Sequence, residues 1–440
     1  MFQTLPGFRE FLPDAASTLD ALFAHWKEIA QRHAFLPFGG PTLEPLDLYI
    51  EKSGPEIVGQ LFAFEDRGGR QVALRPEMTP TVCRMVASQA QGLPKPVRWY
   101  SIAEQYRFER PQKGRLRSFY QFNLDILGIP DAGADLEIIA CGIETLRHLG
   151  LSPADFQLRL SDRVIWMHFL ELHQIAEGDR GHLLSAIDRI EKTPPEKTLE
   201  SLAAIIPDRA ELILSEINAL RSIRSRSDLA DFFLKRLGAD SPLRPILLDR
   251  LAQWDTLLGG IQAMGLSQFV QIDLGIVRGL AYYTGFVFEL FEASGHGRAL
   301  GGGGRYDDLV EKLGGPPTPA VGLALGDVTL LDLLAAKNKL PQETHQLEAF
   351  ITSTPDPVSR NAAFALAADL RRAGFRIGIS LKTSGLGKQF KEGSQHRPGA
   401  FLTISSSSVE TGLVRAKDSS TGDEIEIPLA EVSTYLQSRR

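Results

Sequence analysis

Polar and apolar residues alternate along two stretches that flank a basic segment near residue 110. Before this segment, Gln105, Arg107 and Glu109 alternate with Tyr106 and Phe108. After it, a polar face (Phe119, Gln121, Asn123, Asp125) alternates with an apolar face (Tyr120, Phe122, Leu124, Ile126). Successive side chains of an extended strand point to opposite sides, so the pattern predicts two strands with one face in the core. We expect the polar face to be the floor of a pocket.

Helical spacing dominates other regions of the chain. Apolar residues recur every three or four positions from 17 to 35, where Ser17 or Thr18 is able to cap the helix, and again from 136 to 149. From about 163 to 264 the pattern is almost entirely helical and contains no cluster of catalytic side chains. We interpret this region as a helical insertion.

Helical and strand patterns alternate near the end of the chain. The strand patterns AFITST and RIGISL are separated by a helical pattern, and GLGKQFKEGSQ followed by AFLTISSS repeats the order. Such alternation is typical of an α/β layer with parallel strands. A polar connector, KNKLPQETH, precedes these elements. We therefore expect one domain at 1–335, which contains the insertion at 163–264, and a second domain at 345–440.

The composition is that of a globular chain with two or three domains. The chain has 440 residues, of which 43% are hydrophobic and 23% charged. The net charge of −6 does not indicate a nucleic-acid binder, and residues 345–440 carry only 12 basic against 10 acidic side chains. The two cysteines and the histidines lack metal-site spacing, so we expect no metal-ligating residues. A charged, proline-containing start and the lack of a long apolar run predict a cytoplasmic protein without a membrane span.

The segment RFERPQKGRLR, residues 107–117, has five basic side chains against Glu109 alone, a local charge of +4. Pro111 and Gly114 disfavour regular structure there. A long basic hairpin can fold over a polyanion, because guanidinium groups form paired hydrogen bonds with phosphate oxygens. Basic loops are more often solvated surface hairpins. The polar strand face beside this loop favours a phosphate-binding site.

Two further stretches contain candidate ligand-binding residues. Glu77 lies where a strand pattern turns into a helix, which suits a binding carboxylate and equally a glutamate that the helix dipole stabilises. Tyr282 and Tyr283 precede a strand pattern, and adjacent tyrosines are more often core residues than ligand contacts. The glycines at 301–304 lack the P-loop pattern. A close approach between a strand and a ligand explains these glycines better.

The sequence RFERPQKGRLRSFYQF resembles motif 2 of the histidyl-tRNA synthetases, which are class II aminoacyl-tRNA synthetases. The resemblance implies that Arg107 is catalytic and binds the α-phosphate of ATP, with Glu109 and Arg115 also at the nucleotide. It implies that Gln121 and Asp125 bind the histidine substrate. The family usually has glutamate where this chain has Asp125, so the carboxylate is kept on a shorter side chain.

Two elements before motif 2 extend the resemblance. LRPEMT resembles a family element that holds the α-amino group of histidine, which assigns Glu77, Met78 and Thr79 to histidine binding. FLPFGGPTLEPLDLY resembles motif 1 in position, with Pro41 where the family has its dimer-interface proline. The resemblance therefore implies a homodimer.

Two elements after motif 2 match the family with departures. RGLAYYTGFVFEL resembles the histidine-specific motif RGLDYYTGTVFE, in which Arg278 would face the α-phosphate and the substrate carboxylate as a second catalytic arginine. Tyr282 and Tyr283 would line the imidazole pocket, and Ala281 replaces the usual aspartate. In motif 3 the family's nucleotide-binding arginine is Thr329 here, which is the most serious departure.

The resemblance covers nearly the whole chain outside the insertion and implies an α+β fold. The expected parts are a class II catalytic domain with an antiparallel sheet, a helical insertion near the acceptor stem of tRNA, and a C-terminal α/β anticodon-binding domain. In the last, Lys382, Lys388 and Lys391 are candidate phosphate contacts. The implied reaction activates L-histidine with ATP and Mg²⁺ to histidyl-adenylate and transfers the histidyl group to tRNA(His).

Two other functions are compatible with the sequence. A catalytically inert paralogue would act as a regulatory subunit of ATP phosphoribosyltransferase in histidine biosynthesis, which Thr329 favours and the C-terminal domain disfavours. A module that senses tRNA or histidine without chemistry fits the complete motif 2 less well. Loss of one preorganised charge contact typically costs about 100- to 1000-fold in rate. Other basic residues and Mg²⁺ remain, so we expect an active ligase.

Overall fold

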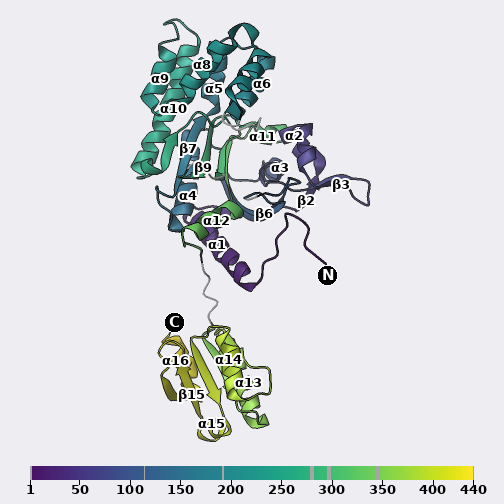
Figure 1. Ribbon diagram of the computed structural model, residues 1–440, viewed down its shortest axis with the longest axis vertical. Helices are drawn as coiled ribbons and strands as arrows, with labels where there is room; N and C mark the ends of the chain where they lie inside the picture. The colour runs from purple at the N-terminus through teal and green to yellow at the C-terminus, as the bar shows by residue number, and fades with distance from the viewer. Residues whose placement is uncertain are drawn as a thin grey trace. The chain divides into compact units, whose positions relative to one another are not determined.

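A mixed eight-stranded sheet lies at the centre of the first of two units in the computed structural model (Figure 1). The units are Met1–Gln342 and Glu343–Arg440. The structure describes residues 2–112, 114–190, 193–277, 282–294, 299–341 and 347–439. Arg278 and Ala281 lie outside these ranges, so their predicted roles are not addressed by the structure.

The central sheet has the strand order β1-β5-β6-β11-β10-β9-β7-β8. Neighbouring strands are antiparallel except at the two edges, where β1 pairs with β5 and β7 with β8 in parallel. The predicted antiparallel sheet is therefore confirmed, with parallel pairs added at its edges. The strands are β1 (Leu36–Pro37), β5 (Val97–Tyr106), β6 (Ser118–Leu127), β7 (Phe156–Asp162), β8 (Val270–Ile272), β9 (Phe286–Glu292), β10 (Ala299–Arg305) and β11 (Ala320–Gly326).

The two predicted strands around the basic segment form a long hairpin. β5 and β6 pair along their whole length, from Val97 opposite Leu127 to Tyr106 opposite Ser118. The side chains of Phe122, Leu124 and Ile126 are buried in the main hydrophobic core, as the alternation predicts. β5 ends at Tyr106, so the strand-like alternation predicted for residues 107–109 continues into the loop instead of the sheet.

Three helices cover the apolar face of the central sheet. They are α1 (Pro13–Arg32), α4 (Ala132–His148) and α12 (Asp327–Ala336), and their buried side chains join the same core as the strands. The helix predicted at 17–35 is confirmed, but its predicted cap is wrong: α1 begins at Pro13, and Leu12 at the cap position makes no side-chain bond. Proline suits a first helical position because its missing N–H has no partner there in any helix.

A smaller layer lies beside one end of the sheet. Strands β2 (Leu43–Pro45), β4 (Gln71–Leu74) and β3 (Ala63–Glu65) form an antiparallel sheet in that order. With it are helices α2 (Leu46–Ser53), α3 (Thr79–Gln89) and α11 (Leu309–Lys312) and the 3-10 helix Pro55–Gln60. Side chains of α3, β5, β6, β9 and α11 form a second hydrophobic cluster, which includes Tyr282, Tyr283 and Tyr306.

The region from Arg163 to Ala263 is helical and gathers at one end of the first unit in Figure 1. A buried ion pair connects it with the sheet: Arg250 donates from Nε and Nη2 to Asp162 at 2.7 and 2.8 Å, and Trp254 Nε1 donates to the same carboxylate at 2.7 Å. Its helices are α5 (Arg163–Leu172), α6 (Glu177–Arg189), α7 (Pro195–Ala203), α8 (Ala210–Arg221), α9 (Arg226–Leu234) and α10 (Leu243–Ala263), with 3-10 helices at Pro207–Arg209 and Ser267–Phe269.

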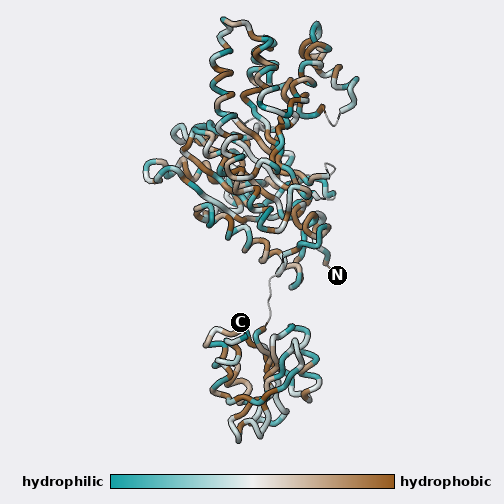
Figure 2. The backbone as a smooth tube through the Cα atoms, turned by 90° about the vertical axis from the view of Figure 1, so that its left-hand side faces the viewer, coloured by the Kyte–Doolittle hydropathy of each residue, from teal (hydrophilic) through white to brown (hydrophobic). Residues whose placement is uncertain are grey.

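The second unit is an α/β layer with its own core. Its sheet has the order β13-β12-β14-β15-β16, in which the first three strands are parallel, as predicted, and the last two form an antiparallel edge that the alternation did not predict. Figure 2 shows hydrophobic segments running through this sheet and through the central sheet of the first unit. The elements are β12 (Ala349–Ser353), α13 (Pro357–Arg372), β13 (Ile377–Ile379), α14 (Leu386–Ser394), β14 (Ala400–Ile404), α15 (Ser406–Thr411), β15 (Leu413–Asp418), β16 (Glu424–Pro428), the 3-10 helix Leu429–Glu431 and α16 (Val432–Gln437).

Glycines allow the backbones of β10 and β11 to come into direct contact. A methyl group at Gly303 would overlap the carbonyl oxygen of Gly322, and one at Gly301 would overlap that of Ala324. The sequence predicted a close approach between a strand and a ligand, whereas at these two glycines the close approach is between neighbouring strands. Arg305, at the end of β10, forms a buried ion pair with Asp135 of α4, which fixes the strand against the helix layer.

We predict that Gly303→Ala destabilises the fold by about 2–3 kcal/mol, because the added methyl group has no space between two backbones. The matched control is Gly133→Ala in α4, where nothing lies within 4 Å of the added carbon. Alanine there is expected to be neutral or to stabilise by up to about 1 kcal/mol. Urea unfolding followed by circular dichroism measures both. Equal stabilities for the two variants would contradict the contact between β10 and β11.

None of the helices within the described ranges combines the length and apolar character that a membrane span requires.

Candidate functional site

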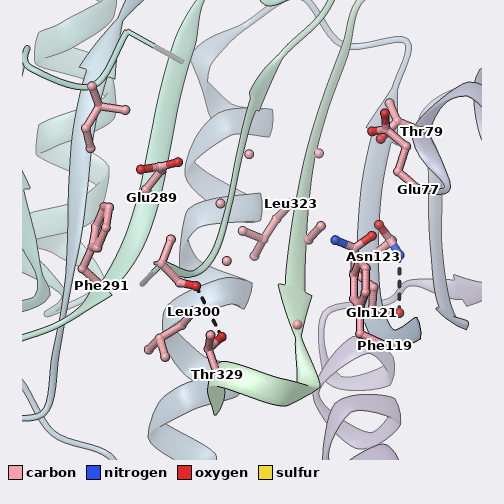
Figure 3. Close-up of a pocket in the computed structure, with 18 of the residues that line it drawn as sticks. Glu77, Thr79, Phe119, Gln121, Asn123, Glu289, Phe291, Leu300, Leu323 and Thr329 are labelled. Atoms are coloured by element: carbon pink, nitrogen blue, oxygen red, sulfur yellow. Dashed lines mark hydrogen bonds between the residues drawn. The ribbon is translucent and has the colours of Figure 1, made fainter. Parts of the chain in front are cut away.

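The polar face of the central sheet borders a cavity of about 950 Å³ (Figure 3). Its wall comes from β6, β9, β10 and β11, the loop after β5, the corner before α3 and the first turn of α12. Residues predicted from distant parts of the sequence meet in this wall. They are Glu77, Thr79, Arg107, Glu109, Arg115, Gln121, Asp125, Tyr282 and Tyr283.

The floor of the cavity includes the predicted polar face of β6. Phe119, Gln121, Asn123 and Asp125 all line it, so the prediction from the alternation is confirmed. Gln121 Oε1 is buried and has no hydrogen-bond partner among the described residues, which makes it available to a ligand. Asn123 was predicted to share this face but was not singled out as a site residue. Figure 3 shows the side chains of Gln121 and Asn123 next to each other in this wall.

Arg107 lies at the end of the β5–β6 hairpin with its guanidinium group held at the cavity. Its Nε donates to the carbonyl oxygen of Pro76 at 3.1 Å, and its Cζ lies 5.1 Å from the ring centroid of Phe119. Glu109 and Arg115, from the two sides of the basic loop, form an ion pair with each other. The loop and the start of β6 therefore present guanidinium groups and an aromatic ring to the same space, an arrangement that suits a nucleotide.

Glu77 lies between the end of β4 and the start of α3, as predicted, and its carboxylate is paired with a lysine that sequence reasoning missed. Lys52 Nζ lies 2.5 Å from Glu77 Oε2, and the lysine side chain has no exposed surface. The same Nζ lies 4.0 Å from the centroid of the Tyr282 ring. Burial lowers the pKa of Lys52, and the charge of Glu77 opposes this shift.

Asp125 is buried at the same end of the cavity and accepts a hydrogen bond from the hydroxyl group of Tyr306. Burial raises the pKa of Asp125 to about 7, against the opposing effects of Tyr306 and Lys52. A methyl group at Gly322 would overlap the Asp125 carboxylate, so this glycine leaves the space that the carboxylate occupies. Tyr306 also lines the cavity. It was not identified from the sequence, because the glycine-rich stretch before it suggested a role for the backbone and not for side chains.

The remaining predicted residues at this end differ in exposure to the cavity. Tyr282 and Tyr283 are only 6% and 5% exposed, and their ring centroids lie 4.5 Å apart. Both tyrosines belong to a hydrophobic cluster and also line the cavity. Met78 is buried and is not part of the cavity wall. Thr79 is the first residue of α3 and lines the cavity.

The motif 3 position lies in the first turn of α12, at the cavity. Thr329 lines the wall, and its hydroxyl group donates to the carbonyl oxygen of Ala299 at 3.3 Å, as Figure 3 shows. Two residues earlier, Asp327 is fully buried and accepts hydrogen bonds from Arg9 Nη2 at 2.7 Å and from the backbone N–H of Tyr120 at 3.0 Å. The start of α12 therefore connects the N-terminal segment with β6.

One group of three metal-capable side chains occurs among the described residues, away from the cavity wall: His25, Glu28 and His148. Spacing alone did not predict it, because α1 and α4 contribute residues far apart in sequence. Both oxygens of Glu28 have partners, Arg32 at one and His148 Nε2, 3.1 Å away, at the other. The contacts of the group are those of an ion-pair cluster.

Three lysines of the second unit were predicted as phosphate contacts. Lys382, Lys388 and Lys391 are all exposed, and the last two lie one turn apart on α14. No carboxylate pairs with them in the part of the chain that the structure describes. They present positive charge to solvent.

Comparisons with known proteins agree with the two-unit architecture. The family described as histidyl-tRNA synthetase matches residues 7–330, and the anticodon binding domain matches residues 350–439. The chain is 43% identical to the histidine--tRNA ligase of Opitutus terrae over 99% of this chain and 98% of the relative. It is 36% identical to the histidine--tRNA ligase of Halobacterium salinarum over 98% of this chain and 96% of the relative.

The fold resembles solved structures of low sequence identity. The crystal structure of histidyl-tRNA synthetase from Nostoc sp. PCC 7120 covers 100% of both chains with a TM-score of 0.80 at 23% identity. A structure described as an ATP phosphoribosyltransferase regulatory subunit/histidyl-tRNA synthetase from Bacillus halodurans covers 92% of this chain and 98% of that one, with a TM-score of 0.73 at 24% identity. These likenesses support the α+β fold alone. The extended sequence identity and the family match show that this chain belongs to the histidyl-tRNA synthetase family.

Proposed function

We propose that this chain is a histidine--tRNA ligase that activates L-histidine with ATP and transfers it to tRNA(His). The observation that carries the proposal is the convergence of nine predicted site residues, from separate segments of the sequence, on one cavity. The similarity to named ligases over the whole chain supports it.

The cavity suits a reaction that depends on positioning and charge. In the first step, the histidine carboxylate attacks the α-phosphate of ATP and pyrophosphate leaves. We assign to Arg107 the stabilisation of the charge that develops there. The contacts of its guanidinium group with Pro76 and Phe119 at the cavity support this role. In the second step, the terminal ribose hydroxyl group of the tRNA attacks the carbonyl carbon of the adenylate, an ester bond forms with loss of the hydroxyl proton, the bond to the phosphate oxygen breaks, and AMP leaves. No activated nucleophile of the protein is required.

Glu77 and Asp125 are the proposed partners of the α-ammonium group, with Thr79 and Gln121 beside them. The unpartnered Oε1 of Gln121 supports this assignment, because a buried amide oxygen gains a hydrogen bond when a donor binds. Tyr282 and Tyr283 supply the apolar wall for the imidazole ring. Arg278 remains the predicted second contact to the α-phosphate and to the substrate carboxylate.

Mg²⁺ is part of the proposal as a partner of the ATP phosphates. Magnesium ions in such sites are held by substrate phosphates and one or two carboxylates. We expected no metal-ligating residues from the sequence, but the carboxylates of Glu289 of β9 and Asp273 line the cavity and would offer oxygen ligands to this ion. Asp273 Oδ2 lies 3.7 Å from Arg159 Nη1, a cation that Mg²⁺ would have to displace from this carboxylate. When bound, Mg²⁺ would neutralise part of the phosphate charge.

Two finer features also remain proposals. A homodimer is supported by the match of motif 1, in which Pro41 is exposed on the single chain. A cytoplasmic location stays a sequence-based prediction. The regulatory-paralogue alternative is not favoured, because the chain has an anticodon-binding domain and matches named ligases over nearly its whole length.

Arg107→Ala is expected to reduce histidine-dependent ATP–pyrophosphate exchange by about 100- to 1000-fold, the typical loss for one preorganised charge contact. Arg278→Ala is expected to have the same effect. Circular dichroism should show an unchanged fold in both variants. The matched control is Arg70→Ala, which removes an arginine with an 80% exposed side chain in the turn before β4. Normal exchange in Arg107→Ala would refute its role, and no exchange in the unmodified protein would refute the ligase function.

The KM for histidine is expected to depend on the protonation of Asp125, whose pKa is raised to about 7. Because of the raised pKa, the Asp125 carboxyl group gains its proton as the pH falls through about 7. About 90% of the Asp125 side chains are therefore protonated at pH 6 and about 10% at pH 8. The KM should therefore rise about tenfold from pH 8 to pH 6. Asp125→Asn should have a high KM at both values, whereas the exposed control Asp240→Asn keeps the normal dependence. Identical pH profiles for Asp125→Asn and Asp240→Asn would contradict this assignment.

The double variant Lys388→Ala, Lys391→Ala is expected to raise the KM for tRNA in the charging reaction by about tenfold, since two phosphate contacts are lost. For the same reason, the slope of the logarithm of the tRNA binding constant against the logarithm of the salt concentration should become shallower by about two. ATP–pyrophosphate exchange should stay unchanged, because it requires no tRNA. Arg372→Ala is the control, since the charge of Arg372 is already paired with Asp369. Unchanged tRNA charging in the double variant would exclude α14 from the interface.

A further inference from the structure

Lys52 is a buried cation placed directly behind the amino-acid end of the cavity. It occupies the last turn of α2, where the helix dipole favours a positive charge. Its side chain is fully buried, and it does not form part of the cavity wall. Its two close partners, Glu77 and Tyr282, do form part of the wall. Lys52 therefore acts on the cavity through these two side chains.

We propose that Lys52 is a positioning residue that sets the net charge of the amino-acid pocket, so that the pocket takes histidine as an α-ammonium ion with a neutral imidazole ring. This inference rests on the proposed function. Glu77 and Asp125 contribute two negative charges when ionised, and Lys52 contributes one positive charge. Arg107 is assigned to the α-phosphate of ATP, so the remaining single negative charge matches the α-ammonium group of the substrate.

The charged and titratable groups around Lys52 come from several elements. Glu77 pairs with it directly, and Tyr282 faces it across 4.0 Å. Asp125 of β6, Cys83 of α3 and Arg107 interact with it through their charges or ionisable groups. Since the site is buried, the loss of one positive charge is poorly screened by water.

Removal of Lys52 would leave the carboxylates of Glu77 and Asp125, which interact through their charges, without this cation. Like charges in a buried site do not both ionise at neutral pH, so one carboxylate would keep a proton. Asp125 already holds its proton to a higher pH than an exposed aspartate. The variant would therefore bind histidine well only at a higher pH, at which both carboxylates lose their protons.

The test compares Lys52→Met with the unmodified chain in ATP–pyrophosphate exchange from pH 6 to pH 9. We expect the KM for histidine to rise at least about tenfold at pH 7 and to recover in part by pH 9, while kcat and the KM for ATP change less than about threefold. Lys27→Met is the matched control, because it removes an exposed lysine of α1. A Lys52→Met profile that superimposes on that of the unmodified chain would overturn the proposal, even if the enzyme is active.

Lys52→Gln distinguishes charge from hydrogen bonding and serves if the methionine variant does not fold. Glutamine keeps a donor for Glu77 but carries no charge, so we expect its pH profile to shift as in Lys52→Met. A normal profile in Lys52→Gln would show that a hydrogen bond suffices and would refute a role for the charge.

Calorimetry of the unmodified chain with histidine alone gives a readout that does not depend on exchange activity. Titrations in two buffers of different ionisation enthalpy, at pH 7, measure the protons released on binding. We expect release of about half a proton, because Asp125 must ionise when the α-ammonium group binds. Binding without proton release would contradict the charge balance. Exchange activity in the unmodified chain tests the ligase function separately.

Discussion

Direct contact between the backbones of β10 and β11 is the constraint on which the cavity depends. Gly303 approaches the carbonyl group of Gly322 so closely that no side chain fits between them. Glycines of both strands form part of the cavity wall, and the polar face of β6 continues it on one side. A ligand in this space would meet backbone below and charged or aromatic groups around it. Such a fixed surface favours catalysis by orientation and electrostatics.

Much of this arrangement could be predicted where local chemistry and periodicity agree. The alternation of Gln121, Asn123 and Asp125 with buried apolar residues identified the floor, since a strand repeats every two residues. The corner position of Glu77 and the basic loop were also readable from sequence. Periodicity cannot show which distant segments come together. The resemblance to a family predicted that Tyr282 and the polar face of β6 belong to one site, and both line the cavity.

The residues that sequence reasoning missed are those whose importance depends on tertiary contacts. Lys52 belongs to an ordinary helical stretch, and only the fold brings its Nζ to Glu77. Tyr306 follows a run of glycines, and only the folded structure shows that its hydroxyl group donates a hydrogen bond to Asp125. The predicted cap at Ser17 or Thr18 was wrong for a local reason, because Pro13 already provides a start for α1. In the second unit, the antiparallel edge of β15 and β16 follows from pairing between strands, which a pattern of single elements does not specify.

The N-terminal segment is bound to two elements of the cavity wall, β6 and α12. Gly7 accepts hydrogen bonds from the backbone N–H groups of Arg117 and Ser118, and Arg9 is paired with the buried Asp327 at the start of α12. The same carboxylate also holds the start of β6 through Tyr120. Gly7 and Arg9 thus support the starts of β6 and α12, both of which contribute to the cavity wall. Engineering of this protein should therefore place fusion partners and affinity tags at the far terminus, and leave the leading residues intact.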